Sequence, residues 1–126
     1  MYIAAYLSGL YKLDITSGKG EWVQKEDSIS LAGIDGLEWY DNSVIVNSPT
    51  EHKAIRRLYF NNDQSKITRE EILAYHPKLI HETTTGTIVG NRFYFIANSG
   101  IDAYQNDGSL ATDKLEEPVI MECILQ

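Results

Sequence analysis

The sequence is short of the features that mark secreted and membrane proteins. Its only cysteine, Cys123, excludes a disulfide within the chain. No segment approaches the roughly 18 consecutive apolar residues that a membrane helix needs. No basic region follows Met1, as it would in a signal peptide, so we expect a cytoplasmic protein. Cys123 lies in an apolar run near the C-terminal end, which predicts a buried and unreactive thiol.

Basic residues are also few. The 126 residues include 11 Lys and Arg against 18 Asp and Glu, which gives a net charge of −7. This balance disfavours nucleic acid and anionic membrane surfaces, and we expect neither as a partner. The length suffices for one hydrophobic core. Eight tyrosines and short apolar runs favour half-buried strands over helices.

One segment of the chain occurs twice. Residues 33–48 form the first copy and residues 84–99 the second, with Gly36 and Gly86 placed 50 positions apart. A truncated third copy opens the chain, where residues 2–14 match the segment that begins at Tyr94. A period near 50 residues made of short strands is typical of β-propeller blades.

The sequence therefore predicts an all-β chain of about three blades, each built on four antiparallel strands. The expected blades are an incomplete one at 1–26, a second at 33–75 and a third at 84–125. A tight turn is expected at Ser8-Gly9. About eleven strands are predicted, at residues 2–7, 10–15, 21–24, 37–40, 44–47, 54–60, 67–75, 86–89, 92–97, 100–104 and 119–125.

Residues 67–75 admit two interpretations. Thr68 followed by Glu71 before an apolar residue is a capping-box pattern, which favours a helix. The repeat instead requires a fourth, outer strand here, and an exposed outer strand tolerates polar sequence. We predict a strand on the strength of the repeat.

The repeated residues carry a family resemblance. Residues 9–14 (GLYKLD), 33–37 (GIDGL) and 84–99 resemble the six-bladed propellers of the SMP-30/gluconolactonase/strictosidine-synthase-like family. The complete domain of that family is about twice this length. The resemblance therefore implies the C-terminal half of such a ring, a partial six-bladed propeller that starts after the innermost strand of its first blade.

The resemblance also implies a metal site. In the lactonases of this family a divalent metal at the channel mouth is held by carboxylate and amide oxygens, and Asp35 matches the aspartate of an Asp-Gly-Leu motif. Calcium or another divalent ion suits such donors. The family's other ligands lie in blades that this chain does not contain. Asp35 can equally be a turn residue, because Thr85 takes the equivalent place in the next copy.

Other chemical candidates are few. None of the histidines, His52, His76 and His81, has metal-ligand spacing to another. His81 is the candidate catalytic base, since it precedes the Thr triplet at the expected channel mouth. Asn47 and Asn98 end their strands, and we expect them to be turn residues rather than ligands.

Two classes of function follow. The first is metal-dependent hydrolysis of a small lactone or ester by the complete propeller, as the resemblance implies. The second is a non-catalytic propeller fragment that binds a ligand or assembles. Half a ring would leave two apolar blade faces open, so two copies could complete a pseudo-six-bladed ring as a homodimer. The competing expectation is a fragment of a longer protein that folds poorly alone.

Overall fold

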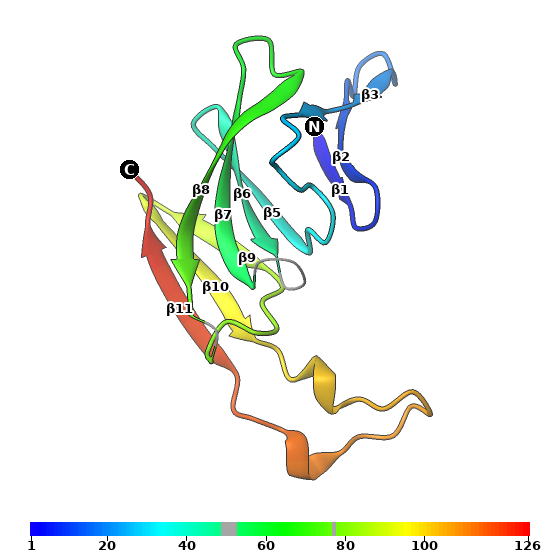
Figure 1. Cartoon of the computed structure of the whole chain (residues 1–126), viewed down its shortest axis with the longest axis vertical. Coiled ribbons are helices and arrows are strands. Elements are labelled where there is room, and N and C mark those ends of the chain that lie inside the picture. Colours follow the sequence, from blue (N-terminus) through cyan, green and yellow to red (C-terminus); the bar gives the residue numbers. More distant parts are fainter. Residues whose placement is uncertain (49–52, 77) are drawn as a thin grey trace.

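The computed structural model describes residues 1–48, 53–76 and 78–126 and is an all-β chain with two short 3-10 helices. The described residues contain eleven strands in three sheets, which we name by their order in the chain (Figure 1). The number agrees with the prediction, although not every predicted strand forms. The N-terminal sheet contains β1 (Tyr2–Ala5), β2 (Gly9–Leu13) and β3 (Gly20–Trp22). The middle sheet contains β4 (Gln24–Lys25), β5 (Gly36–Tyr40), β6 (Ser43–Ser48), β7 (Ala54–Phe60) and β8 (Lys66–Tyr75). The C-terminal sheet contains β9 (Gly86–Val89), β10 (Arg92–Asn98) and β11 (Val119–Ile124).

All neighbouring strands pair antiparallel except β4 and β8, which are parallel. The four strands from β5 to β8 form an antiparallel meander, which the parallel strand β4 extends beside β8. The N-terminal and C-terminal sheets each contain three strands. Only the middle sheet therefore reaches the four antiparallel strands that the repeat predicts.

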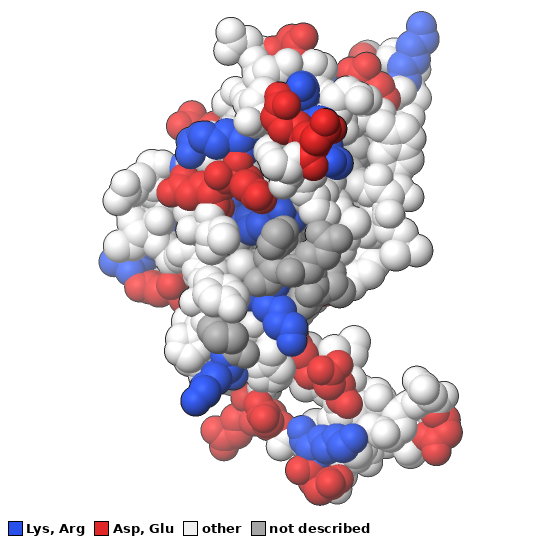
Figure 2. Space-filling model, viewed as in Figure 1, with Lys and Arg blue, Asp and Glu red and all other residues white. Residues whose placement is uncertain are grey.

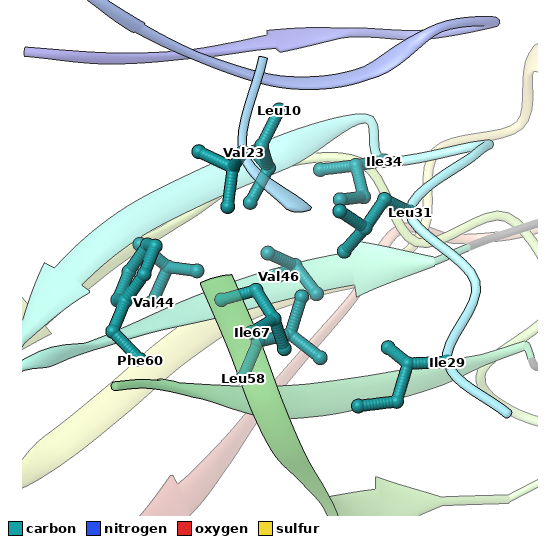
Figure 3. Close-up of a cluster of buried hydrophobic side chains, with 10 residues drawn as sticks. All are labelled: Leu10, Val23, Ile29, Leu31, Ile34, Val44, Val46, Leu58, Phe60 and Ile67. Atoms are coloured by element: carbon teal, nitrogen blue, oxygen red, sulfur yellow. The ribbon is translucent and has the colours of Figure 1, made fainter. Parts of the chain in front are cut away.

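The middle sheet lies between the other two, and its central strands β6 and β7 are buried on both faces. In β6, Val44 and Val46 point to the N-terminal sheet, while Ile45 points to the C-terminal sheet, and all three are fully buried. This alternation follows from the two-residue period of a strand. Complete burial of one such side chain contributes about 1.5 to 3 kcal/mol. Figure 3 shows the first core cluster, formed by Leu10, Val23, Ile29, Leu31, Ile34, Val44, Val46, Leu58, Phe60 and Ile67.

The prediction of a strand rather than a helix at 67–75 is confirmed. Two neighbouring glutamates of β8 point to opposite sides: Glu70 pairs with Arg56, and Glu71 accepts a hydrogen bond from Tyr59. Both glutamates thus find a partner on β7 while the chain is extended, so this polar sequence does not require a helix. The hairpin of β5 and β6 is also confirmed, with its turn at Asp41 and Asn42, both at positive φ.

The prediction of a strand at 100–104 is wrong. Residues Ile101–Ala103 form the 3-10 helix η1, and Thr112–Lys114 form η2. Gly100 has a φ of 72°, a left-handed conformation that ends the extended chain. Its N–H donates to Asn98 Oδ1 at 3.0 Å, which closes a turn directly after β10. Figure 1 shows that the segment carrying η1 and η2 projects away from the three sheets.

Two boundaries near the N-terminus also differ from prediction. The first turn comprises Tyr6 to Ser8, where Ser8 N–H donates to the Ala5 carbonyl at 2.8 Å, so Gly9 already opens β2. The strand expected at 21–24 is divided. Trp22 ends β3, and Gln24 begins β4 in the middle sheet.

The paired arginines of β7 lie on opposite faces, as strand alternation predicts, and form no basic patch. Arg56 is completely buried and Arg57 nearly so. On the face shown in Figure 2, basic and acidic side chains are interspersed over the sheets, and several acidic ones gather on the projecting segment. In the described part of the chain, no helix has the length and apolar character required to span a membrane.

Candidate functional site

An open pocket of about 960 Å³ lies at one end of the sheets. Asp35 comes just before β5, and His81 lies on the segment that leads to β9, so both β5 and β9 start beside the pocket. The pocket thus brings together the two residues that the sequence singled out, although they are 46 positions apart. Its polar lining comprises Asp35, Lys53, His81, Glu82, Thr83, Thr84, Ser99 and Asp102. Apolar surface comes from Tyr6, Ile101 and Tyr104.

Asp35 is exposed toward this pocket. Its backbone N–H donates to the Asn47 carbonyl at 3.0 Å, which extends the β5–β6 pairing by one residue. Its carboxylate accepts no hydrogen bond from any described residue, whereas the carboxylate of a turn aspartate accepts bonds from nearby backbone amides. The aspartates at positions 14, 63 and 107 do accept such bonds, so Asp35 differs from the turn aspartates of the same chain.

Asn47 lies behind Asp35, and its expected place in a turn is wrong. It belongs to β6, is completely buried, and donates from Nδ2 to Thr83 Oγ1 at 2.7 Å. Its Oδ1 atom is buried and has no partner among the described residues. Asn98, in contrast, ends β10 and accepts the Gly100 N–H, so its prediction as a turn residue is confirmed.

His81 and Glu82 hold different positions in the pocket. The His81 side chain is 26% exposed, and its Nε2 lies 3.8 Å from Glu116 Oε2. Glu82 is buried and accepts hydrogen bonds from the Asp102 N–H at 3.2 Å and from Ser99 Oγ at 3.4 Å. Glu82 therefore attaches η1 to the end of β10. Sequence reasoning did not select Glu82, and its only signal was its place beside His81.

The described residues do not by themselves form a metal centre. Within residues 1–48, 53–76 and 78–126 there is no group of three His, Cys, Asp or Glu side chains that could hold a metal ion. The Asp35 carboxylate and the Asn47 Oδ1 atom, which accept no hydrogen bond from the described residues, are hard oxygen donors, but Ca²⁺ takes six to eight such ligands. A metal at Asp35 would thus need most of its ligands from beyond the described His, Cys, Asp and Glu side chains.

The remaining candidates lie away from this chemistry. The exposed His76 accepts the Leu79 N–H at Nδ1, at 3.3 Å, and so caps a turn. His52 is outside the described residues. Cys123 is half-buried against a second core cluster, which lies between the middle and C-terminal sheets and is formed by Ile45, Ile55, Ile80, Phe93, Phe95, Ala97 and Leu125. This burial, with the nearby Glu122 charge, raises the pKa of its thiol to about 11. The thiol is therefore protonated at neutral pH, in agreement with the predicted lack of reactivity.

Comparison of the chain with protein-family models, with curated proteins and with solved structures finds no match. The chemistry of the pocket is therefore argued from its lining residues and their geometry.

Proposed function

We propose that this chain forms three blades of a β-propeller and that the pocket at its strand ends binds a small polar molecule. The observation that carries this proposal is the convergence on one pocket of Asp35, in the first copy of the repeat, and His81, just before the second copy. Convergent polar groups in a concave site are the usual mark of a ligand site.

The stacking of the sheets supports the propeller. The three sheets follow one another in chain order, and two core clusters fill the two spaces between them. The innermost strands β5 and β9 are neighbours, because Gly36 lies against the backbone of Thr84 and Thr85. Inner strands that meet side by side are expected around a propeller axis. The pocket then occupies the mouth of the axial channel.

The chemistry of the lining supports a hydroxylated ligand. Asp35 and Asp102 offer acceptors for hydroxyl groups, and the neutral hydroxyls of Thr84 and Ser99 can donate or accept. The nearby tyrosine ring of Tyr104 provides apolar surface for a sugar-like ring. A small molecule with several hydroxyls and one carbonyl, such as a sugar lactone, fits this combination.

Hydrolysis is the reaction that we propose for the complete propeller. His81 is the only described histidine in the pocket and is the candidate base. It would take a proton from water as the hydroxide adds to the lactone carbonyl carbon. When the ring C–O bond breaks, the same proton returns to the leaving alkoxide. A protein that lacks this step would still bind the ligand, so binding is the property to test first.

The test is an NMR titration with an aldonolactam, the hydrolytically stable amide analogue of a sugar lactone. We expect shifts at the amides of residues 35, 81 and 102. Asp35→Asn and His81→Gln should each weaken binding about tenfold, the equivalent of about 1.4 kcal/mol. Asp27→Asn is the matched control, because Asp27 is exposed and does not line this pocket. Equal affinity in all three variants, or shifts confined to other residues, would reject the proposal.

A further inference from the structure

Equivalent residues of the middle and C-terminal sheets face the same way along the stack. Val44 of β6 points back to the N-terminal sheet, and Phe95 of β10, 51 positions later, points back to the middle sheet. Ile45 points forward and is fully buried by the C-terminal sheet. Ile96 is its equivalent on the C-terminal sheet, but it is only half-buried, since no described sheet lies over it.

The outward surface of the C-terminal sheet is largely apolar. We call it the forward end face, and strand register places Ile96 opposite Ile120 on it. Ile120 is 72% exposed. The charged residues of this face, Arg92 and Glu122, form an ion pair and cancel. Its apolar members are Val89, Tyr94, Ile96, Ile120 and Ile124.

The N-terminal sheet carries a second apolar surface at the other end of the stack. We call it the backward end face, and it has no charged side chain. Register aligns Ile3 with Tyr11 and Tyr11 with Trp22, whose ring centroids lie 5.1 Å apart. Trp22 is 48% exposed. Its members are Ile3, Ala5, Tyr11, Leu13 and Trp22.

The internal repeat relates the two end faces. In the repeat, Ile3 and Ala5 align with Phe95 and Ala97. Phe95 and Ala97 are the residues with which the C-terminal sheet covers the middle sheet. The backward end face therefore resembles the inner surface of the C-terminal sheet, which covers Ile45 of the middle sheet.

We propose that the forward end face of one copy packs on the backward end face of a second copy, and the reverse, in a closed two-fold dimer of six stacked sheets. Both faces are apolar, and neither carries net charge, so their contact buries no unpaired charge. The contact continues the stacking that already joins the three sheets. A two-fold axis makes the two contacts identical and leaves no end face open. The dimer does not depend on which ligand the pocket binds.

Sedimentation equilibrium of the full chain at micromolar concentration tests the dimer. We expect twice the chain mass of 14.2 kDa. Ile120→Lys should raise the dimer dissociation constant at least about 100-fold, because it places a charge in the apolar contact. Ile15→Lys is the control, since Ile15 is 74% exposed but lies on neither end face. Far-UV circular dichroism checks that each variant keeps its strands.

A charge-pairing variant tests which faces meet. Trp22→Glu combined with Ile120→Lys in one chain should restore part of the association, since opposite charges would then meet at both contacts. No recovery, together with dimers that survive Ile120→Lys, would overturn the proposal. A folded wild-type monomer, a chain that stays molten without pairing, or open-ended higher oligomers would each overturn it as well.

Discussion

Gly36 lies so close to Thr84 that a Cβ atom at Gly36 would overlap the Thr84 carbonyl oxygen. The same Cβ would stand 2.8 Å from Asn47 Oδ1 and 3.0 Å from the Thr85 Cα. Backbone from the middle and C-terminal sheets therefore meets at this point, next to the pocket. Gly86 opens β9 in the second copy and also leaves no room for a Cβ atom, but there the neighbours are the Phe93 ring and the Tyr94 carbonyl oxygen of the same sheet.

Gly36→Ala is expected to destabilise the chain by about 2 to 3 kcal/mol, because backbone atoms cannot move aside as a flexible side chain can. Urea denaturation measures the change. Gly90→Asn is the control: Gly90 has a φ of 62° and open space around it, and asparagine tolerates that conformation. A Gly36→Ala protein as stable as the control would contradict the close packing of β5 on the C-terminal sheet.

Removal of Glu70 should leave a buried charge without its partner. Arg56 Nη1 lies 2.8 Å from Glu70 Oε2, and the Arg56 side chain is only 1% exposed. We expect Glu70→Leu to cost about 3 kcal/mol, the lower end for a broken buried pair because Glu70 itself is partly exposed. The double variant Arg56→Met with Glu70→Leu should recover part of this loss in thermal denaturation. A double variant less stable than Glu70→Leu alone would contradict the assignment.

Tyr2 attaches the N-terminal sheet to the middle sheet. Its ring stacks on Trp39 at 5.4 Å between centroids and lies 4.8 Å from the ring of Phe60. Tyr2→Ala should therefore cost about 2 kcal/mol and change the fluorescence of Trp39. Tyr2→Phe keeps the ring and loses only the hydrogen bond to Gln64, so a cost of about 1 kcal/mol or less is expected. Equal costs for the two variants would show that the ring contact contributes nothing.

Cys123 should react slowly in the folded chain. Its pKa of about 11 lies about two units above that of a free thiol, so alkylation at neutral pH should be roughly 100-fold slower than in urea. Because folding raises the pKa of this thiol, the unfolded chain loses the thiol proton at a lower pH than the folded chain does. The contribution of this thiol to the stability is complete below a pH of about 9 and is lost as the pH rises through about 11. Alkylation at equal rates with and without urea would contradict the burial.

The strands were predictable because their signals are local or repeated. The repeat was sufficient to assign β8 as a strand against the capping-box pattern, and alternation placed Arg56 and Arg57 on opposite faces. The parallel strand β4 was not predictable, because a two-residue strand carries no periodicity. The helix η1 was missed for another reason. The match to the truncated copy at residues 2–14 suggested a strand, whereas the turn at Gly100 and the Glu82 carboxylate hold the chain in a 3-10 conformation.

The pocket was predictable only in part. Asp35 was found from a motif and His81 from its position in the repeat, and the structure places them in one pocket. The role of Asn47 was missed because its burial depends on Thr83, 36 residues away. A contact between residues so far apart in the chain cannot be predicted from the local sequence pattern. The buried ion pair of Arg56 was not predicted for the same reason, because an arginine in an alternating strand is ordinarily expected on the exposed face.

The short strand β4 belongs to the middle sheet because it pairs with β8, although it follows directly on the N-terminal sheet in the sequence. The amide protons of Gln24 and Glu26 are donated to the carbonyls of Ser65 and Ile67. Their exchange with solvent deuterium is thus controlled by opening of the middle sheet, although the preceding strand β3 belongs to the N-terminal sheet. Val23 N–H, one position earlier, donates instead to the Leu10 carbonyl of β2 at 2.9 Å, so the adjacent amides of Val23 and Gln24 are bonded to different sheets. These two amides can therefore act as built-in reporters of whether the first two sheets open together or one after the other.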